Sequence, residues 1–275
     1  MKLACFITKD RLIGDSKVEA LLAALKEIGA ELYDVKTPED IRPGTDMLLS
    51  LGGDGTFLSA APLAYAHSLP VLGVNFGRLG FLSEYAPQQV VNALRDSGFE
   101  VEERELLKVS VEGADLGGLW PYALNEVSVS RVSASMLGTD VCVDGSDLPT
   151  YWADGLLVAT SSGSTAYSLS VGGPICLPDS KVFIVAPISP HNLNVRPLII
   201  PHRSSVEISL RSRDEMAVFS MDNRTIQIPA TAKIRVCAAD RKLKRIRIGK
   251  SNFINALRTK LLWGEDVRNG KDMIL

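Results

Sequence analysis

A glycine-rich segment with one acidic residue, Gly52-Gly53-Asp54-Gly55-Thr56, is the sharpest chemical feature of the sequence. Its glycines would let backbone N–H groups approach an anion, and a helix that starts there would add a favourable dipole. Asp54 would repel a phosphate unless it takes a proton from an attacking hydroxyl or holds a magnesium ion. A tight turn in which Asp54 only caps the helix is the alternative. The segment is neither a Walker A loop nor a GxGxxG motif.

Two further segments contain residues that are suited to bind a nucleotide. Residues 73–82 are rich in glycine, and either Phe76 or Phe81 in this stretch could stack on a base or belong to the core. Asn125 and Glu126 interrupt an otherwise apolar strand. An adjacent amide and carboxylate can hydrogen-bond a ribose diol, and an exposed strand end is the alternative interpretation.

Six consecutive hydroxyl or glycine residues, 160–165, follow an apolar strand that begins just after Asp154. A run of this kind offers many neutral hydrogen-bond donors, which suits an uncharged polar ligand such as a sugar or an amide. Ser164 is not part of a GxSxG motif, and the chain has only three histidines. A serine hydrolase is therefore disfavoured.

Residues 241–250 contain six basic side chains. We interpret this run as an exposed edge strand protected by charge, with a patch that binds phosphate or nucleic acid as the alternative. The whole chain of 275 residues has 30 basic and 32 acidic side chains, and its net charge is −2. This balance argues against a dedicated nucleic-acid-binding protein.

The first hundred residues alternate strand and helix patterns, which predicts parallel strands with helical crossovers. The expected strands are 2–8, 31–35, 46–51 and 70–74, and the expected helices are 16–29, 56–66 and 87–98. The glycine-rich segment at 52–56 then lies between a strand and a helix. Parallel α/β sheets bind phosphate at such a place.

The pattern changes near residue 100 to many short strands separated by turns, which predicts an antiparallel β domain. The expected strands are 108–111, 125–131, 140–143, 156–160, 182–186, 206–210, 217–221, 234–237 and 243–248. The tail is helical again, with Phe253, Ala256, Leu257 and Leu261 on one face. We expect this face to be buried against the N-terminal domain. The expected domains are residues 1–100 together with the tail 252–275, and residues 101–251.

No apolar run approaches the length of a membrane-spanning helix, so we expect no membrane contact. The four cysteines are far apart and form no CxxC pair. Reduced thiols of this kind indicate a cytoplasmic protein. The sequence contains no zinc-binding pattern, and we assign no metal ligands.

Taken together, these segments resemble the NAD kinase family. The matching stretches span most of the chain, and they are Gly52–Thr56, Leu79–Leu82, Asn125-Glu126, Asp154–Leu156, Gly163–Tyr167, Pro190-His191, Arg196–Leu198 and the tail from Leu257 to Trp263. The first motif alone is weak evidence, because lipid kinases and phosphofructokinases share it. The Asn-Glu pair together with the segment Gly163–Tyr167 is much more specific.

The resemblance implies an N-terminal Rossmann-like α/β domain, a C-terminal antiparallel β domain, and a tail helix that returns to the first domain. It also implies a homodimer or homotetramer that transfers a phosphoryl group to the 2′-hydroxyl of the adenosine ribose of NAD, with Mg²⁺ or another divalent cation. Asp54 is then the general base. The implied binding residues for the substrate and nucleotide are Gly53, Gly55, Thr56, Phe81, Asn125, Glu126, Asp154, Thr165, Ala166, Tyr167, Ser170 and Asn223.

The sequence departs from the family pattern at two positions. Ser161 replaces a proline, and Asn223 replaces the glycine of an Asp-Gly pair. Both positions lie near the expected substrate, and the phosphoryl donor, ATP or polyphosphate, stays open. A lipid or sugar kinase that shares the glycine-rich loop is one alternative. A sensor that binds NAD(H) or NADP(H) without turnover is another, although a pure binder gains nothing from Asp54.

Overall fold

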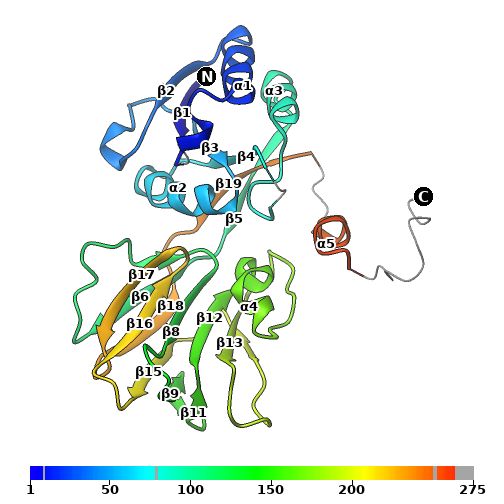
Figure 1. The fold of residues 1–275 in the computed structure, drawn as a ribbon. Helices are drawn as coiled ribbons and strands as arrows, with labels where there is room; N and C mark the ends of the chain where they lie inside the picture. The colour runs from blue at the N-terminus through cyan, green and yellow to red at the C-terminus, as the bar shows by residue number, and fades with distance from the viewer. Residues whose placement is uncertain (9, 78–79, 250–252, 264–275) are drawn as a thin grey trace. The chain divides into compact units, whose positions relative to one another are not determined.

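The computed structural model describes residues 1–8, 10–77, 80–249 and 253–263, and its chain divides into two compact units. The first unit contains Met1–Ala60, Leu69–Val101 and the chain from Ile246 onward. The second contains Ala61–Ser68 and Glu102–Arg245. Figure 1 labels the helices and strands and colours the chain by residue number, so the segments of each unit can be found by colour.

The first unit is built on a six-stranded sheet with the strand order β2-β1-β3-β4-β19-β5. β1 (Lys2–Phe6) pairs in parallel with β2 (Glu31–Asp34) and with β3 (Met47–Gly52), and β3 pairs in parallel with β4 (Val71–Asn75). Every residue of β3 and β4 is buried, as expected for parallel strands that are covered on both faces. The predicted parallel α/β arrangement is confirmed.

Three helices connect these strands: α1 (Ser16–Glu27), α2 (Asp54–His67) and α3 (Pro87–Arg95). α1 begins after Asp15, whose carboxylate accepts the Lys17 N–H at 2.8 Å. Its apolar stripe packs into the sheet core, as does that of α3, which begins with a proline. α2 begins at Asp54, two residues before its predicted start, so the acidic residue lies in the first helical turn.

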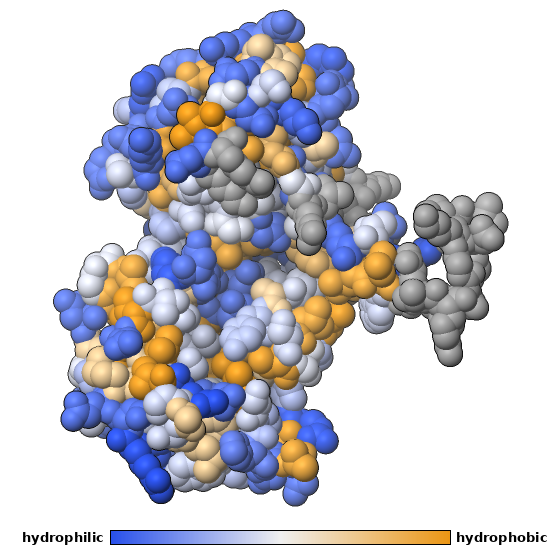
Figure 2. All heavy atoms as spheres, in the orientation of Figure 1, coloured by the Kyte–Doolittle hydropathy of each residue, from blue (hydrophilic) through white to orange (hydrophobic). Residues whose placement is uncertain are grey.

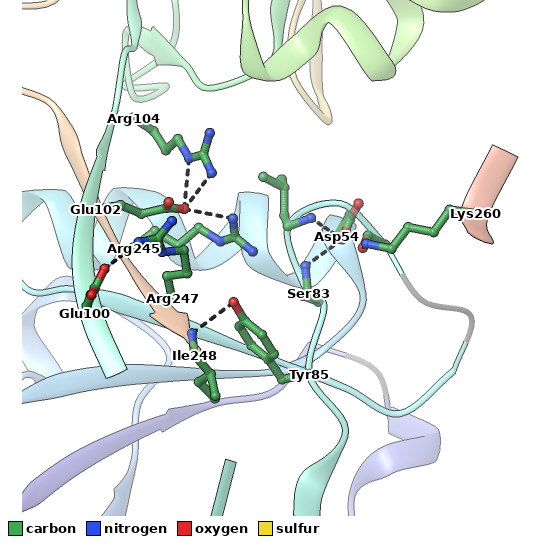
Figure 3. A network of polar contacts seen from close by, with 12 residues as sticks. Asp54, Ser83, Tyr85, Glu100, Glu102, Arg104, Arg245, Arg247, Ile248 and Lys260 are labelled. Atoms are coloured by element: carbon green, nitrogen blue, oxygen red, sulfur yellow. Dashed lines mark hydrogen bonds and ion pairs between the residues drawn. The ribbon is translucent and has the colours of Figure 1, made fainter. Parts of the chain in front are cut away.

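The strand β19 (Leu243–Ile248) was expected in the antiparallel domain, and this expectation is wrong. β19 lies in the sheet of the first unit, between β4 and β5 (Phe99–Arg104), and Ile246 is fully buried in its core. The basic run at 241–250 is therefore not an exposed edge strand. Its side chains pair with acidic residues on and after β5. Arg245 pairs with Glu102 and Arg247 with Glu100 (Figure 3), and Lys242 pairs with Glu105.

The second unit contains two antiparallel sheets, which confirms the predicted β domain. One sheet has the order β10-β9-β15-β18-β6-β7, with β11 also paired to β9. Its strands are β6 (Leu107–Glu112), β7 (Tyr122–Ala123), β9 (Leu137–Val143), β10 (Ser146–Asp147), β11 (Tyr151–Ala153), β15 (Val206–Arg211) and β18 (Lys233–Ala238).

The other sheet has the order β14-β13-β12-β8-β16-β17. Its strands are β8 (Glu126–Ser130), β12 (Gly155–Thr160), β13 (Val182–Ile188), β14 (Leu198–Pro201), β16 (Met216–Met221) and β17 (Arg224–Pro229). Alternate residues of its strands, such as Val127, Phe219 and Met221, enter one core that also includes side chains of the first sheet. The short helices η3 (Ser162–Thr165) and α4 (Tyr167–Ser170) follow β12.

The tail helix α5 (Phe253–Leu261) belongs to the first unit, as predicted. Its apolar face is only partly buried, however. Leu257 is 1% exposed, whereas Leu261 is 37% and Trp263 is 56% exposed. The expectation that this face is buried is therefore wrong for Leu261. Among the described helices, none combines the length and apolarity that a membrane crossing requires.

Candidate active site

Asp54 is placed by the strand-to-helix junction between β3 and α2, where Gly53 precedes the first helical residue. Its carboxylate accepts three backbone N–H groups from the loop after β4, namely those of Phe81 at 2.8 Å, Leu82 at 3.1 Å and Ser83 at 2.8 Å. Figure 3 shows the carboxylate facing this loop. Asp54 thus anchors residues 81–83, a contact that the sequence did not indicate.

The close approach of this loop depends on glycine at two positions. A Cβ atom added to Gly80 would lie 1.9–2.4 Å from the carboxyl atoms of Asp54, and one added to Gly73 would lie 2.8 Å from the Cα of Ser83. Among the described residues, a Cβ at Gly53 or Gly55 would contact nothing within 4 Å. At these two positions the space beside the backbone is not filled by any described residue.

The tail helix α5 contacts Gly80 and Phe81 in the loop after β4. The Lys260 ammonium donates to the carbonyl oxygen of Gly80 and lies 4.8 Å from the centroid of the Phe81 ring. The ring of Phe253 is 5.8 Å from that of Phe81. Phe81, which the sequence suggested as a base-stacking residue, thus packs against α5.

A second polar cluster lies in the second unit at the start of β8. The carboxylate of Asp222, in the turn between β16 and β17, accepts the backbone N–H groups of Leu124 at 2.9 Å, Asn125 at 2.8 Å and Glu126 at 3.3 Å. The Asp222 N–H donates in return to the carbonyl oxygen of Glu126 at 2.9 Å. The sequence showed the Asp-Asn pair at 222–223 but indicated no role for Asp222, because its partners lie almost a hundred residues earlier.

Thr160 joins this cluster to the hydroxyl-rich segment. Its hydroxyl donates to the carbonyl oxygen of Leu124 at 2.5 Å and accepts the Gly163 N–H at 3.0 Å. A Cβ at Gly163 would lie 2.1 Å from the carbonyl oxygen of Asn125, so only glycine permits this contact. The fold therefore brings Asn125 and Glu126 beside η3 and the start of α4.

The Glu126 carboxyl group of this cluster has a raised pKa. Burial, then the nearby charge of Asp222, raise its pKa to about 8, against the opposing effect of a hydrogen bond from the Tyr167 N–H. Its Oε2 atom is buried and has no hydrogen-bond partner among the described residues, and the same holds for the hydroxyl oxygens of Ser162 and Ser168. Buried polar atoms of this kind usually have partners, so they are candidates to bind the polar groups of a ligand.

Family models that match the sequence identify the family of this chain. The family model for the N-terminal domain of ATP-NAD kinase matches residues 10–97, and the model for the C-terminal domain matches residues 124–248. This chain belongs to the NAD kinase family.

Two individual NAD kinases illustrate matches over nearly the whole length of both chains. The chain is 35% identical to the NAD kinase of Flavobacterium psychrophilum, over 98% of this chain and 94% of that protein. It is 37% identical to the NAD kinase of Porphyromonas gingivalis, over 97% of this chain and 99% of that protein.

Two solved structures share the fold. Yeast NADH kinase complexed with NADH has a TM-score of 0.83 and 24% identity, over 98% of this chain and 90% of that one. An NAD kinase from Archaeoglobus fulgidus in complex with ATP has a TM-score of 0.76 and 25% identity, over 95% of this chain and 99% of that one. The family and the fold class expected from the sequence are confirmed.

The remaining residues named from the NAD kinase pattern lie at different places in the two units. Thr56 is buried in the first turn of α2, where its Oγ1 lies 3.1 Å from that of Thr8. Thr165, Ala166, Tyr167 and Ser170 follow Gly163 along η3 and α4, and Tyr167 is exposed. Asn223 lies in the turn beside Asp222, and the described residues include no group of three or more His, Cys, Asp or Glu side chains placed to hold a metal ion.

Asp154, another residue of the NAD kinase pattern, lies apart from the Asn-Glu pair. β12 and β8 are antiparallel, with Ala159 opposite Glu126, so Asp154 lies at the far end of the strand. At about 3.3 Å per residue, the separation is roughly 16–20 Å. There the Asp154 carboxylate pairs with the Arg131 guanidinium at 2.7 Å.

Proposed function

We propose that this protein is an NAD kinase, which transfers a phosphoryl group from ATP or polyphosphate to the 2′-hydroxyl of the adenosine ribose of NAD. The observation that carries the proposal is the cluster of Asn125, Glu126 and Gly163, in which a buried carboxyl oxygen has no protein partner among the described residues. A ribose diol has the hydroxyl groups that such an amide and carboxyl pair can bind. The family relationship supports the same reaction.

In this proposal, Asp54 accepts the proton of the attacking 2′-hydroxyl. A carboxylate has about four lone-pair positions, and three N–H groups leave one for the hydroxyl. Asp54 can therefore anchor the loop and act as the base at once.

The other residues position charge and substrate. Gly53 and Gly55, at the N-terminus of α2, offer backbone N–H groups to the phosphates. Asn125 and Glu126 bind ribose hydroxyls, and the residues 165–167 line the pockets for the two base-like ends of NAD. Phosphoryl transfer needs mostly positioning and charge stabilisation, and a divalent cation that arrives with the phosphoryl donor, which we propose to be Mg²⁺, would offset the phosphate charge.

The function is tested by two measurements. An assay with a panel of phosphoryl donors measures NADP formation, and calorimetry measures NAD binding. We expect NAD to bind and NADP to form with ATP, polyphosphate or both, and only with a divalent cation present. NAD binding without turnover under any donor would instead favour the sensor.

Replacement of Asn125 by alanine is expected to raise KM for NAD about tenfold or more and to leave KM for the donor nearly unchanged. The physical reason is the loss of a buried hydrogen-bonding partner of the ribose, which typically costs about 1–3 kcal/mol. Steady-state kinetics with each substrate varied in turn provide the measurement. A change confined to the donor would mean that the two binding sites are assigned in reverse.

We propose a homodimer or homotetramer in the cytoplasm. Exposed apolar side chains lie on β11, on the edge strand β14 and between β13 and β14, namely Trp152, Leu193, Leu198 and Ile199. Hydrophobic side chains gather at several places on the surface of the second unit (Figure 2), and such patches mark contact surfaces. Light scattering measures the molar mass, which we expect to be two or four times 29.7 kDa.

The cysteines bear on the compartment. All four cysteines are free, as is usual in a reducing compartment.

A further inference from the structure

The turn between β16 and β17 holds the chain segment that leads into the Asn-Glu pair. Asp222 has a φ of +52°, and its side chain is 1% exposed. With one carboxylate it accepts the N–H groups of three consecutive residues, ending with Asn125 and Glu126. A single acidic side chain thus fixes the backbone from which both proposed ribose-binding side chains project.

Arg224 extends this hold toward the preceding residues. Its guanidinium donates to the carbonyl oxygens of Trp120 and Tyr122, each at 2.5 Å, and lies 3.6 Å from the Asp222 carboxylate. Burial raises the pKa of Asp222, and the three N–H groups and the Arg224 charge oppose that rise. Charge-assisted hydrogen bonds of this kind are roughly twice as strong as neutral ones. The turn therefore holds the backbone of residues 120–126 in place through Asp222 and Arg224.

The same carboxylate influences Glu126 through its charge. The groups that act on the Glu126 carboxyl are Asp222 from the β16–β17 turn and the Tyr167 N–H from α4, with Arg224 lying behind Asp222. A like charge nearby favours the protonated form of an acid. Asp222 thus fixes the position of Glu126 and also favours retention of its proton.

We propose that Asp222 is a positioning residue for NAD binding, which holds Asn125 and Glu126 toward the ribose. The proposal rests on the proposed function, because it takes NAD as the ligand. It differs from a purely structural role in two ways. It acts on NAD affinity without acting on the donor, and it changes how that affinity depends on pH.

The decisive variant is Asp222→Asn, which keeps the size of the side chain but removes its charge and one acceptor oxygen. We expect the Kd and the KM for NAD to rise about tenfold or more, since buried N–H groups lose an acceptor. Neither kcat nor KM for the donor should change more than about threefold. The midpoint of the pH dependence of NAD affinity should move to lower pH, because without the Asp222 charge Glu126 ionises more readily.

Three further variants distinguish this role from a general loss of stability. In Glu126→Gln the pH midpoint should be absent, and adding Asp222→Asn to it should produce no pH shift, so the two effects are coupled. Asp144 is a matched control, since it also lies in a hairpin turn with φ of +50° and its carboxylate accepts the Ser205 N–H at 2.8 Å. Asp144→Asn should leave NAD affinity and its pH midpoint unchanged.

Calorimetry with NAD alone gives the primary result, so it does not depend on turnover. If the wild-type protein binds NAD but forms no NADP, the proposed function fails and the role of Asp222 is still tested. The proposal is overturned if Asp222→Asn leaves NAD affinity unchanged. A melting temperature that falls while affinity and pH midpoint stay constant, or equal losses for NAD and donor, would also overturn it.

Discussion

Replacing Asp54 by asparagine is expected to lower kcat about 10²- to 10⁴-fold, because the variant cannot accept the proton of the 2′-hydroxyl. The fold adds a second consequence. The asparagine NH₂ group is a donor, and it would face the N–H groups of Phe81 or Ser83 that now point at a carboxylate oxygen. Single-turnover measurements of NADP formation, with calorimetry for NAD, measure the loss and separate it from binding.

Gly80→Ala is the control for this second consequence. It keeps the Asp54 carboxylate but adds a Cβ that would lie within 2.4 Å of it, so the loop must shift. We expect a smaller loss of kcat in this variant than in Asp54→Asn. An equal loss in both would show that Asp54 serves chiefly to anchor the loop, and near-full turnover in Asp54→Asn would exclude it as the base.

The local parts of this fold and site were predictable from the sequence. Apolar periodicity and glycine positions placed β3, the glycine-rich segment and α2 in order, because these signals depend on neighbours in the chain. The same holds for the short antiparallel strands after residue 100. The polar pair Asn125 and Glu126 was recognisable because it interrupts an apolar strand.

The distant partners were not predictable. Asp54 contacts a loop 27–29 residues later, and Asp222 contacts Leu124 to Glu126 across 96–98 residues. Neither pairing leaves a periodic signal, since each depends on how strands are ordered in the finished sheet. The basic run on β19 was misread for this reason, because its acidic partners lie more than 130 residues earlier.

The α5 helix shows the limit of periodicity as evidence for burial. Its apolar spacing predicted the helix correctly, yet only Leu257 of that stripe is nearly fully buried. Periodicity shows which side chains share a face, but the neighbouring surface decides how much of that face is covered. Lys260, which contributes polar contacts to Gly80 and Phe81, had no signal in the apolar pattern at all.

Replacing Glu102 by alanine is expected to destabilise the second unit by about 3 kcal/mol. The Arg245 side chain is 2% exposed, and its guanidinium donates to Glu102 at 2.9 Å, while Arg104 donates to the same carboxylate oxygen (Figure 3). Removal of the carboxylate takes a negative charge and an acceptor oxygen away from two largely buried cations, and loss of one member of a buried ion pair is costly. Urea unfolding followed by fluorescence measures the change.

Glu103→Ala is the matched control for this variant. Glu103 is the next residue along β5, its side chain is 57% exposed, and its pair with Lys242 is long at 3.8 Å. Exposed pairs contribute about 0–1 kcal/mol, so this variant should be close to wild type. The chain passes between its two units at 101–102 and again at 245–246, and Glu102 and Arg245 lie at these two points. A Glu102→Ala protein as stable as the Glu103→Ala protein would show that the Glu102–Arg245 ion pair contributes nothing to the stability of the second unit.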